Sequence, residues 1–187
     1  MKREWRVIGI DDVSFEKFKS KTTLLIGVVS RLTGRVDGIL SSRVKVDGLD
    51  ATRKIEEMIS RSKFRPQIKV IFLGGISFAG LNVVDIKALN EKLGIPVIVI
   101  MRKKPNMDRF LKALDHGSKP ELRKKIVMKA GEVLRVGKIY VQLAGIDYEK
   151  AKKIIKASAI YSEVPEALRL AHLIASGIGL GESRGRV

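Results

Sequence analysis

The sequence predicts an α/β protein with a mixed sheet, in which an antiparallel three-strand meander is followed by parallel strands flanked by helices. Three β-rich segments with short links come first, and adjacent strands joined in this way pair antiparallel. Short apolar runs then alternate with amphipathic helices, which predicts parallel pairing. The remaining third is mostly helical. A chain of 187 residues suits one domain, so we expect residues 1–187 to form a single domain.

The antiparallel part begins with an apolar, β-branched run, Trp5–Ile10, that ends at the acidic pair Asp11-Asp12. Thr22–Ser30 is a second run, and a short turn that contains Gly34 leads into a third, Val36–Val46. Their spacing predicts a meander of three strands.

The parallel part follows a predicted helix that starts after Asp50, with apolar residues at Ala51, Ile55, Met58 and Ile59 on one face. Two short continuous apolar runs are typical of strands buried on both faces. They are Ile68–Leu73 and Val97–Met101, and the helix between them is Asp85–Leu93. Three antiparallel strands followed by parallel strands on helices is the ribonuclease H-like arrangement, which few other common folds have.

The last part is predicted to be helical apart from one short strand, which we expect at an edge of the sheet. The predicted helices are Met107–His116, Glu121–Ala130, Asp147–Ala159 with Asp147 as N-cap, and Pro165–Ser176; the strand is Lys138–Leu143; and Gly177–Val187 is predicted to be a flexible tail.

The charge indicates a polyanionic partner. The net charge is +17 and the isoelectric point is about 10.2. The segment Arg102–Lys156 holds 16 Lys and Arg against six Asp and Glu. Nucleic acid is the simplest such partner, and a charge-rich, heat-adapted surface is the alternative. Only ten aromatic residues are present, which does not favour a base-stacking platform.

Composition excludes several classes of site. There is no Cys, so disulfides, thiolate zinc sites and Cys nucleophiles are excluded, and two His cannot form a His-rich metal site. The sequence contains no run of 18 apolar residues, so no membrane helix is predicted, and its first residues have no signal-peptide pattern. We expect a soluble, cytoplasmic protein with no membrane partner.

Four acids occupy strand ends or helix starts: Asp11, Asp12, Asp50 and Asp85. In the ribonuclease H-like layout the ends of the first and fourth strands and the first helix meet at one edge. Carboxylates there would hold Mg²⁺ (or Mn²⁺), which would activate water for phosphodiester cleavage. For Asp50 and Asp85, helix capping is the alternative.

Several other residues have two interpretations each. The loop Gly74–Gly80 is either a backbone nest for phosphate or a tight turn. The basic residues Arg102, Lys103 and Lys104 follow a central strand, so they either contact nucleic acid near the scissile phosphate or form a solvated loop.

Two residues of the last helix are also ambiguous. Arg169 is a candidate contact to nucleic acid, and an ion pair with Glu166, three residues earlier, is its alternative. His172 shares that helix, and a packed or surface role is favoured over a catalytic one.

Three segments resemble endonuclease V. Gly9–Phe15 (GIDDVSF) is similar to its first-strand motif, Gly94–Arg102 to a later strand that ends in a basic residue, and Pro165–Ala171 (PEALRLA) to its closing helix. The order fits nearly the whole chain. The chain resembles more closely the archaeal relatives of endonuclease V that are called endonuclease dU. Three further segments are similar to that group: Val46–Ala51, Gly80–Asp85 and Gly181–Gly185. The resemblance implies cleavage of DNA at deoxyuridine with a divalent metal.

The chain departs from endonuclease V at two acids. The second acid of endonuclease V is a Glu in the first helix, and this chain has Lys54 at that position. Asp50 lies one turn away on the same helix and is a candidate substitute. The acid after the fourth strand is missing, because the chain reads Leu73-Gly74-Gly75, and Asp85 is the nearest replacement. Asp11 ranks slightly above Asp12 as the first acid.

The leading hypothesis is a metal-dependent endonuclease that nicks DNA at deaminated bases, most simply deoxyuridine. Gly74, Gly75 and Ser77 are the expected wall of a pocket for the extruded base. One alternative is a non-catalytic nucleic-acid-binding protein on the same scaffold. Another is an RNA endonuclease, although DNA is favoured over RNA. Convergence of Asp11 or Asp12 with Asp50 and Asp85 in space would favour catalysis, whereas acids that point apart would favour the binding protein.

Overall fold

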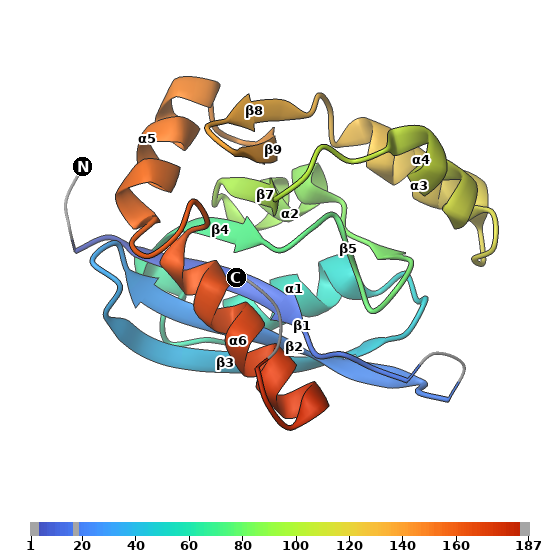
Figure 1. Ribbon diagram of the computed structural model, residues 1–187, viewed down its shortest axis with the longest axis horizontal. Coiled ribbons are helices and arrows are strands. Elements are labelled where there is room, and N and C mark those ends of the chain that lie inside the picture. Colours follow the sequence, from blue (N-terminus) through green and yellow to red (C-terminus); the bar gives the residue numbers. More distant parts are fainter. Residues whose placement is uncertain (1–3, 17–18, 184–187) are drawn as a thin grey trace.

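The computed structural model describes residues 4–16 and 19–183, and its centre is a seven-stranded mixed sheet in the order β3-β2-β1-β4-β7-β9-β8 (Figure 1). β1 pairs antiparallel with β2 and parallel with β4, β4 pairs parallel with β7, and β9 pairs antiparallel with β7. The strands of this sheet are β1 (Arg6–Asp12), β2 (Thr22–Arg31), β3 (Val36–Lys45), β4 (Ile68–Leu73), β7 (Val97–Met101), β8 (Leu134–Val136) and β9 (Ile139–Ala144). The predicted meander and the predicted ribonuclease H-like order are confirmed.

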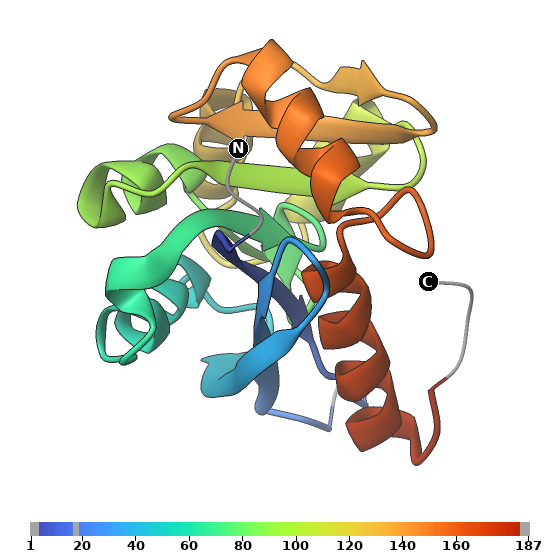
Figure 2. The same ribbon diagram turned by 90° about the vertical axis from the view of Figure 1, so that its left-hand side faces the viewer.

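Helices cover both faces of the sheet (Figure 2). One face carries α1 and α2, and the other carries α5 and α6. The helices are α1 (Ala51–Ser60), α2 (Ile86–Leu93), α3 (Met107–Leu114), α4 (Pro120–Lys129), α5 (Tyr148–Ser158) and α6 (Glu166–Leu180); a 3₁₀ turn spans Arg65–Gln67, and β5 (Ser77–Phe78) and β6 (Asn82–Val83) form a small hairpin.

The central strands divide their apolar side chains between two cores. In β4, Ile71 and Leu73 join the core under α1 and α2, whereas Val70 and Phe72 join the core under α5 and α6. All four are essentially inaccessible to solvent. Alternate residues of a strand point to opposite faces, so a strand between two helical layers must be apolar throughout.

The close approach of α6 to β1 depends on Gly9. A Cβ at this position would overlap the backbone of Ala167 and Leu168. Only a residue without a side chain lets the helix pack at this distance. Gly9 therefore brings the C-terminal helix, which is remote in sequence, to the end of the first strand.

Two C-terminal predictions were wrong. The strand predicted at Lys138–Leu143 is not an edge strand, because β9 lies between β7 and β8 and the short β8 forms the edge. Gly177 to Leu180, predicted as part of a flexible tail, form the last turn of α6. Tertiary packing overrides the poor helix propensity of glycine here, since a Cβ on Gly179 would lie 3.0 Å from the Ser14 backbone. Residues 184–187 of that tail lie outside the described residues.

A buried arginine joins the α3–α4 segment to the sheet. Arg123 of α4 has no accessible surface. Its guanidinium donates to the carbonyl oxygens of Asp47 at 2.6 Å, Gly48 at 2.9 Å and Ser118 at 2.6 Å, and also to that of Leu81. A buried cation is tolerated only when its donors are satisfied in this way. Arg123 thus connects the loops after β3 and before β6 to α4.

Candidate active site

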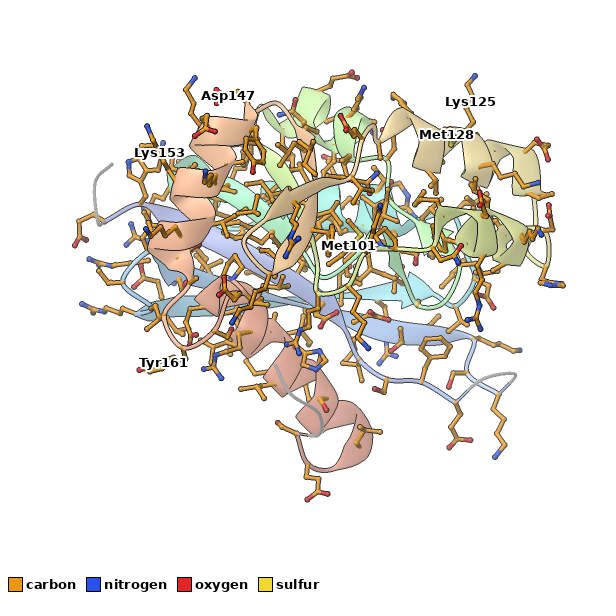
Figure 3. The ribbon with its side chains drawn as sticks, turned by 45° about the horizontal axis from the view of Figure 1, so that its top comes forward. Met101, Lys125, Met128, Asp147, Lys153 and Tyr161 are labelled. Carbon is orange, nitrogen blue, oxygen red and sulfur yellow. The ribbon has the colours of Figure 1, made fainter. Side chains whose placement is uncertain are left out.

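An open cleft of about 480 Å³ lies where the carboxyl ends of β1, β4 and β7 meet α6. This volume is within the range of small-ligand sites. The carboxyl ends of parallel strands are the usual position of ligand sites in α/β sheets. Met101, labelled in Figure 3, lies in its wall. The lining residues are Asp11, Gly74, Ile100, Met101, Arg102, Lys103, Val164, Leu168 and His172.

The central polar contact of the cleft joins Asp11 at the end of β1 to His172 of α6. His172 Nδ1 lies 2.7 Å from Asp11 Oδ2, so the ring donates to the carboxylate. The side chain of Asp11 is 15% exposed and that of His172 is 41% exposed. The hydrogen bond to Asp11 raises the pKa of His172 above its usual value, against the opposing effects of burial and of the nearby Arg102 cation. The imidazole therefore holds a proton to a higher pH than a free histidine does.

Gly74 allows the Asp11 carboxylate to lie directly on the end of β4. A Cβ on Gly74 would lie 2.9 Å from Asp11 Oδ1 and 3.1 Å from Asp11 Cγ. The Gly74 N–H also donates to the Ile10 carbonyl oxygen at 3.0 Å. The space that a side chain on Gly74 would take is thus filled by the carboxylate of Asp11. This steric relation gives a physical reason for the glycine that the sequence showed at that position.

Asp12 lies away from the cleft. Successive strand residues point to opposite faces, and Asp12 Oδ2 accepts a hydrogen bond of 2.8 Å from the Ala79 N–H. Burial, with a smaller contribution from the charge of Asp11, raises the pKa of Asp12 from 3.8 to about 6. Of the two adjacent acids, Asp11 alone lines the cleft.

Asp50 is engaged with the hairpin that follows β4. It precedes α1 but makes no side-chain cap bond. Its Oδ1 instead accepts from Asn82 Nδ2 at 2.8 Å and from the Lys45 N–H at 3.3 Å. The capping bond to the Ala51 N–H, of 2.9 Å, comes from Asn82 Oδ1. Asp50 therefore supports the start of α1 indirectly, through Asn82.

Asp85 is the N-cap of α2. Its Oδ1 accepts from the Ala88 N–H at 2.9 Å, and its Oδ2 pairs with Lys129 Nζ at 2.9 Å. Among residues 4–16 and 19–183, no three His, Asp or Glu side chains gather as a group that could hold a metal ion. The expected convergence of Asp11, Asp12, Asp50 and Asp85 is therefore not found, because the last two are bound to other elements.

Some of the predicted basic residues lie at the cleft, and one is bound to another residue. Arg102 and Lys103 line the cleft next to His172, and Lys104 is exposed beside them. Arg169 makes two hydrogen bonds, of 2.7 and 2.6 Å, to the carboxylate of the buried Glu166. Arg169 therefore forms the ion pair with Glu166 that was its alternative interpretation.

The loop after β4 provides one wall residue of the cleft. Gly74 lines it, whereas Gly75 and Ser77, predicted to form a base pocket with Gly74, are not among its lining residues. Ser77 instead starts the β5–β6 hairpin, where it pairs with Val83. The apolar wall comes from Ile100 of β7 and from Leu168 of α6.

Sequence reasoning gave His172 too little weight. A packed or surface histidine was favoured, but the ring is bonded to an acid that lies 161 residues away in sequence. The usable signal was its place in the closing helix, which the resemblance aligned with endonuclease V, in a chain with only two His.

The cleft offers a hard divalent ion one carboxylate, that of Asp11. Mg²⁺ takes oxygen ligands and is often held by one or two carboxylates, several waters and a substrate phosphate. Asp11 supplies one largely buried carboxylate at the cleft, and Arg102 and Lys103 would hold a phosphate beside it. A dedicated cage of three protein acids is absent from the described residues, so such an ion would depend on substrate for part of its coordination.

Comparisons with known proteins agree with this architecture. A family model described as "Endonuclease dU" matches residues 3–179. A UPF0215 protein of Archaeoglobus fulgidus is 46% identical over 184 residues, which cover 98% of this chain and 99% of that protein. A UPF0215 protein of Methanothermobacter thermautotrophicus is 45% identical over 189 residues, with 99% and 93% coverage.

Solved structures give the same result. A protein of unknown function from A. fulgidus superposes with a TM-score of 0.90 at 46% identity, over 95% of this chain and all of that one. Endonuclease V of Bacillus subtilis matches with a TM-score of 0.62 at 15% identity, over 91% of this chain and 79% of that one. Endonuclease V of Ciona intestinalis, solved with a 24mer DNA that contains an inosine followed by a ribo-adenosine, matches with a TM-score of 0.58 at 16% identity, over 89% and 82%. The fold is that of endonuclease V. In the described part of the chain, no helix is long and apolar enough to span a membrane.

Proposed function

The chain belongs to the Endonuclease dU family, and we propose that it is a metal-dependent endonuclease that nicks DNA at deaminated bases, deoxyuridine first among them. Family membership and the endonuclease V fold support a nuclease activity. The finer assignment, to DNA repair at deoxyuridine, rests on the family description.

One observation carries the proposal: the Asp11–His172 pair beside two cations in an open cleft. A carboxylate 2.7 Å from an imidazole, next to Arg102 and Lys103, is suited to a phosphodiester. The cations bind the phosphate, the carboxylate orients the imidazole, and the imidazole holds a proton near a developing negative charge.

The roles of the residues follow from these contacts. Arg102 and Lys103 offset the repulsion between the phosphate and Asp11. Because Nδ1 of His172 is bonded to Asp11, Nε2 is the ring nitrogen available to a phosphate oxygen or to the leaving oxygen. The hydrogen bond to Asp11 raises the pKa of His172, which favours the protonated ring that this donation needs. The apolar side chains of Ile100 and Leu168 line the cleft beside these groups.

A divalent ion is part of the proposal. Asp11 would hold it together with the substrate phosphate and water molecules, because Asp12 points away from the cleft. When bound, such an ion would polarise the phosphate and lower the pKa of a water molecule. Substrate binding and metal binding would then be coupled, since the chain itself supplies few ligands.

Recognition of the lesion would involve extrusion of the base. Chemistry directed by a base in a duplex requires the base to leave the stack, and this costs least for mispaired or unpaired bases. Uracil opposite guanine should therefore be cut faster than uracil opposite adenine, and single-stranded DNA should be at least as good a substrate.

The test is a nicking assay on oligonucleotides that contain deoxyuridine, inosine or no lesion, with and without Mg²⁺. Asp11→Asn and His172→Gln should each lose most of the Mg²⁺-dependent nicking at deoxyuridine. Asp50→Asn is the matched control, because an Asn oxygen can still accept from Asn82. Equal cutting of damaged and undamaged strands would leave a general nuclease without lesion specificity. Preferential cutting of inosine-containing RNA would favour the RNA endonuclease.

A second candidate is a non-catalytic nucleic-acid-binding protein. It is favoured by a specific observation, the absence of a three-acid cluster in the described residues. The same assay separates the two, because binding without cutting under Mg²⁺ or Mn²⁺ would support the binding protein.

A further inference from the structure

Tyr161 differs from the other aromatic residues in its exposure. Its accessibility is 78%, and it lies in the loop between α5 and α6, where Figure 3 labels it at the periphery of the molecule. Within residues 4–16 and 19–183 it is the only exposed aromatic residue. A single exposed apolar residue is ordinary in itself, so its surroundings decide whether this position has a function.

A charged residue packs against one face of the Tyr161 ring. The guanidinium carbon of Arg169 lies over the Tyr161 ring, 5.4 Å from its centroid. Arg169 is itself fixed by two hydrogen bonds to Glu166, which is 5% exposed. A cation above an aromatic face is a favourable contact. The ring is therefore oriented by a rigid helical residue, while most of its surface stays open to solvent.

The ring belongs to a segment that contributes to the wall of the cleft. Val164, three residues after Tyr161, lines the cleft, as does Leu168, which directly precedes Arg169. Arg169 and His172 are three residues apart on α6, which is about 4.5 Å along a helix axis. A nucleic-acid strand with a phosphate at His172 advances by only about 3.4 Å per nucleotide in a stacked form. A strand that continued along α6 from His172 toward Arg169 would therefore bring a nucleotide a few steps from that phosphate to Tyr161.

We propose that Tyr161 stacks on an unpaired base of the strand bound in the cleft, a few nucleotides from the phosphate at His172. The identity of the ligand rests on the proposed function. Stacking of a base on an aromatic ring does not depend on the base sequence, because every base has a π face. A single stacking residue beside the cleft is also compatible with a chain that has few aromatic residues.

The first experiment measures binding of fluorescently labelled single-stranded DNA to the full chain without metal, so that cutting plays no part. Tyr161→Ala should raise Kd by roughly 5- to 150-fold, the usual effect of removing one stacking side chain. Tyr161→Phe should bind like the wild type. Tyr161→Leu still covers Arg169 with an apolar group but has no π face, so it should behave like the Ala variant. Ile39→Ala, another exposed apolar residue at 56% accessibility, is the matched control on β3.

The second experiment locates the stacked base. Single abasic nucleotides are placed in turn along the oligonucleotide, and each is tested with the wild type and with Tyr161→Ala. One position should weaken binding of the wild type by about the same factor as the mutation, and the variant should be insensitive to that change. A double-mutant cycle of this kind isolates the contact between the two groups.

The outcomes separate this inference from the proposed function. A wild type that binds DNA, together with a Tyr161→Ala variant of the same Kd, would overturn the stacking inference alone. A Leu variant that binds as well as the Phe variant would also overturn it. A wild type that binds no nucleic acid at any salt concentration would overturn both. Circular dichroism and Tm of Tyr161→Ala should match the wild type, because the side chain is exposed.

Discussion

The substitution Gly74→Ala tests the arrangement of the cleft most directly. A Cβ at this position would lie 2.9 Å from Asp11 Oδ1, whereas ordinary contacts of this kind begin near about 3.4 Å. The Asp11 carboxylate must therefore retreat by about 0.5 Å. Gly74 is exposed and does not have a left-handed backbone, so the alanine itself fits the local conformation.

The magnitude follows from the hydrogen bond that Asp11 makes. A shift of about 0.5 Å lengthens or tilts the 2.7 Å contact to His172. A misplacement of about 1 Å at a reacting centre can cost about 100-fold in rate, so we expect roughly a tenfold loss in single-turnover nicking. Stability should change by less than about 1 kcal/mol, because the strain is offset by the lower entropy of the unfolded alanine chain.

The assay has two independent readings. Nicking at deoxyuridine reports the rate, and an NMR titration reports the pKa of the His172 imidazole, which should fall toward 6.5 as the bond to Asp11 weakens. Gly177→Ala is the matched control, since its Cβ would meet only Ser183 Oγ at 3.5 Å. Gly74→Asp should be more damaging than alanine and should not improve the enzyme. A Gly74→Ala variant with the wild-type rate and the wild-type His172 pKa would refute this account of the site.

The remaining predictions concern Asp12, the basic rim and the buried arginine. The pKa of Asp12 in the folded protein, about 6, is above its usual value of 3.8. Protonation of Asp12 therefore favours the folded state, and this contribution to stability is lost as the pH rises from about 3.8 through about 6. At pH 8 without metal, Asp12→Asn should therefore have a free energy of unfolding up to about 3 kcal/mol above that of the wild type, and the difference should shrink toward pH 4; a difference that does not change with pH would contradict the assigned burial. Reversing Arg102 and Lys103 to Glu should weaken binding to all DNA sequences alike and reduce the salt slope by about 0.9 for each phosphate that is no longer neutralised; the same slope in variant and wild type would contradict their role in binding phosphate. Arg123→Met removes the buried guanidinium that donates to the carbonyl oxygens of Asp47, Gly48 and Ser118 and should lower the free energy of unfolding by about 3–5 kcal/mol in denaturant titrations; a decrease under about 1 kcal/mol would show that those oxygens find other partners.

The fold could be predicted from the sequence because its signals are local. The continuous apolar runs Ile68–Leu73 and Val97–Met101 became β4 and β7 with those bounds. The Asp147 N-cap was also predicted, and its side chain accepts from the Lys150 N–H. Such patterns depend on residues within one element, so periodicity and capping chemistry are enough to find them.

The site was only partly predictable for the opposite reason. Asp11 was predicted from its place at the end of a strand. Asp50 and Asp85 were predicted as metal ligands because they stand at helix starts, where the sequence cannot distinguish an Asp that caps a helix from one that binds a metal. Only the tertiary structure shows that Asp50 binds Asn82 and that Asp85 binds Lys129. These contacts join residues 32 and 44 positions apart, and no local pattern records such pairs.

The sequence by itself determined the chemistry available to this protein: a basic chain, few histidines, no cysteine, and an acidic pair at the end of an apolar strand. The tertiary structure decided which of those groups meet. His172 reaches Asp11 because Gly9 lets α6 lie against β1, and Asp11 has room because Gly74 has no side chain. Both glycines are visible in the sequence, but the function of an absent side chain depends on what packs into its space, and that is a property of the folded chain alone.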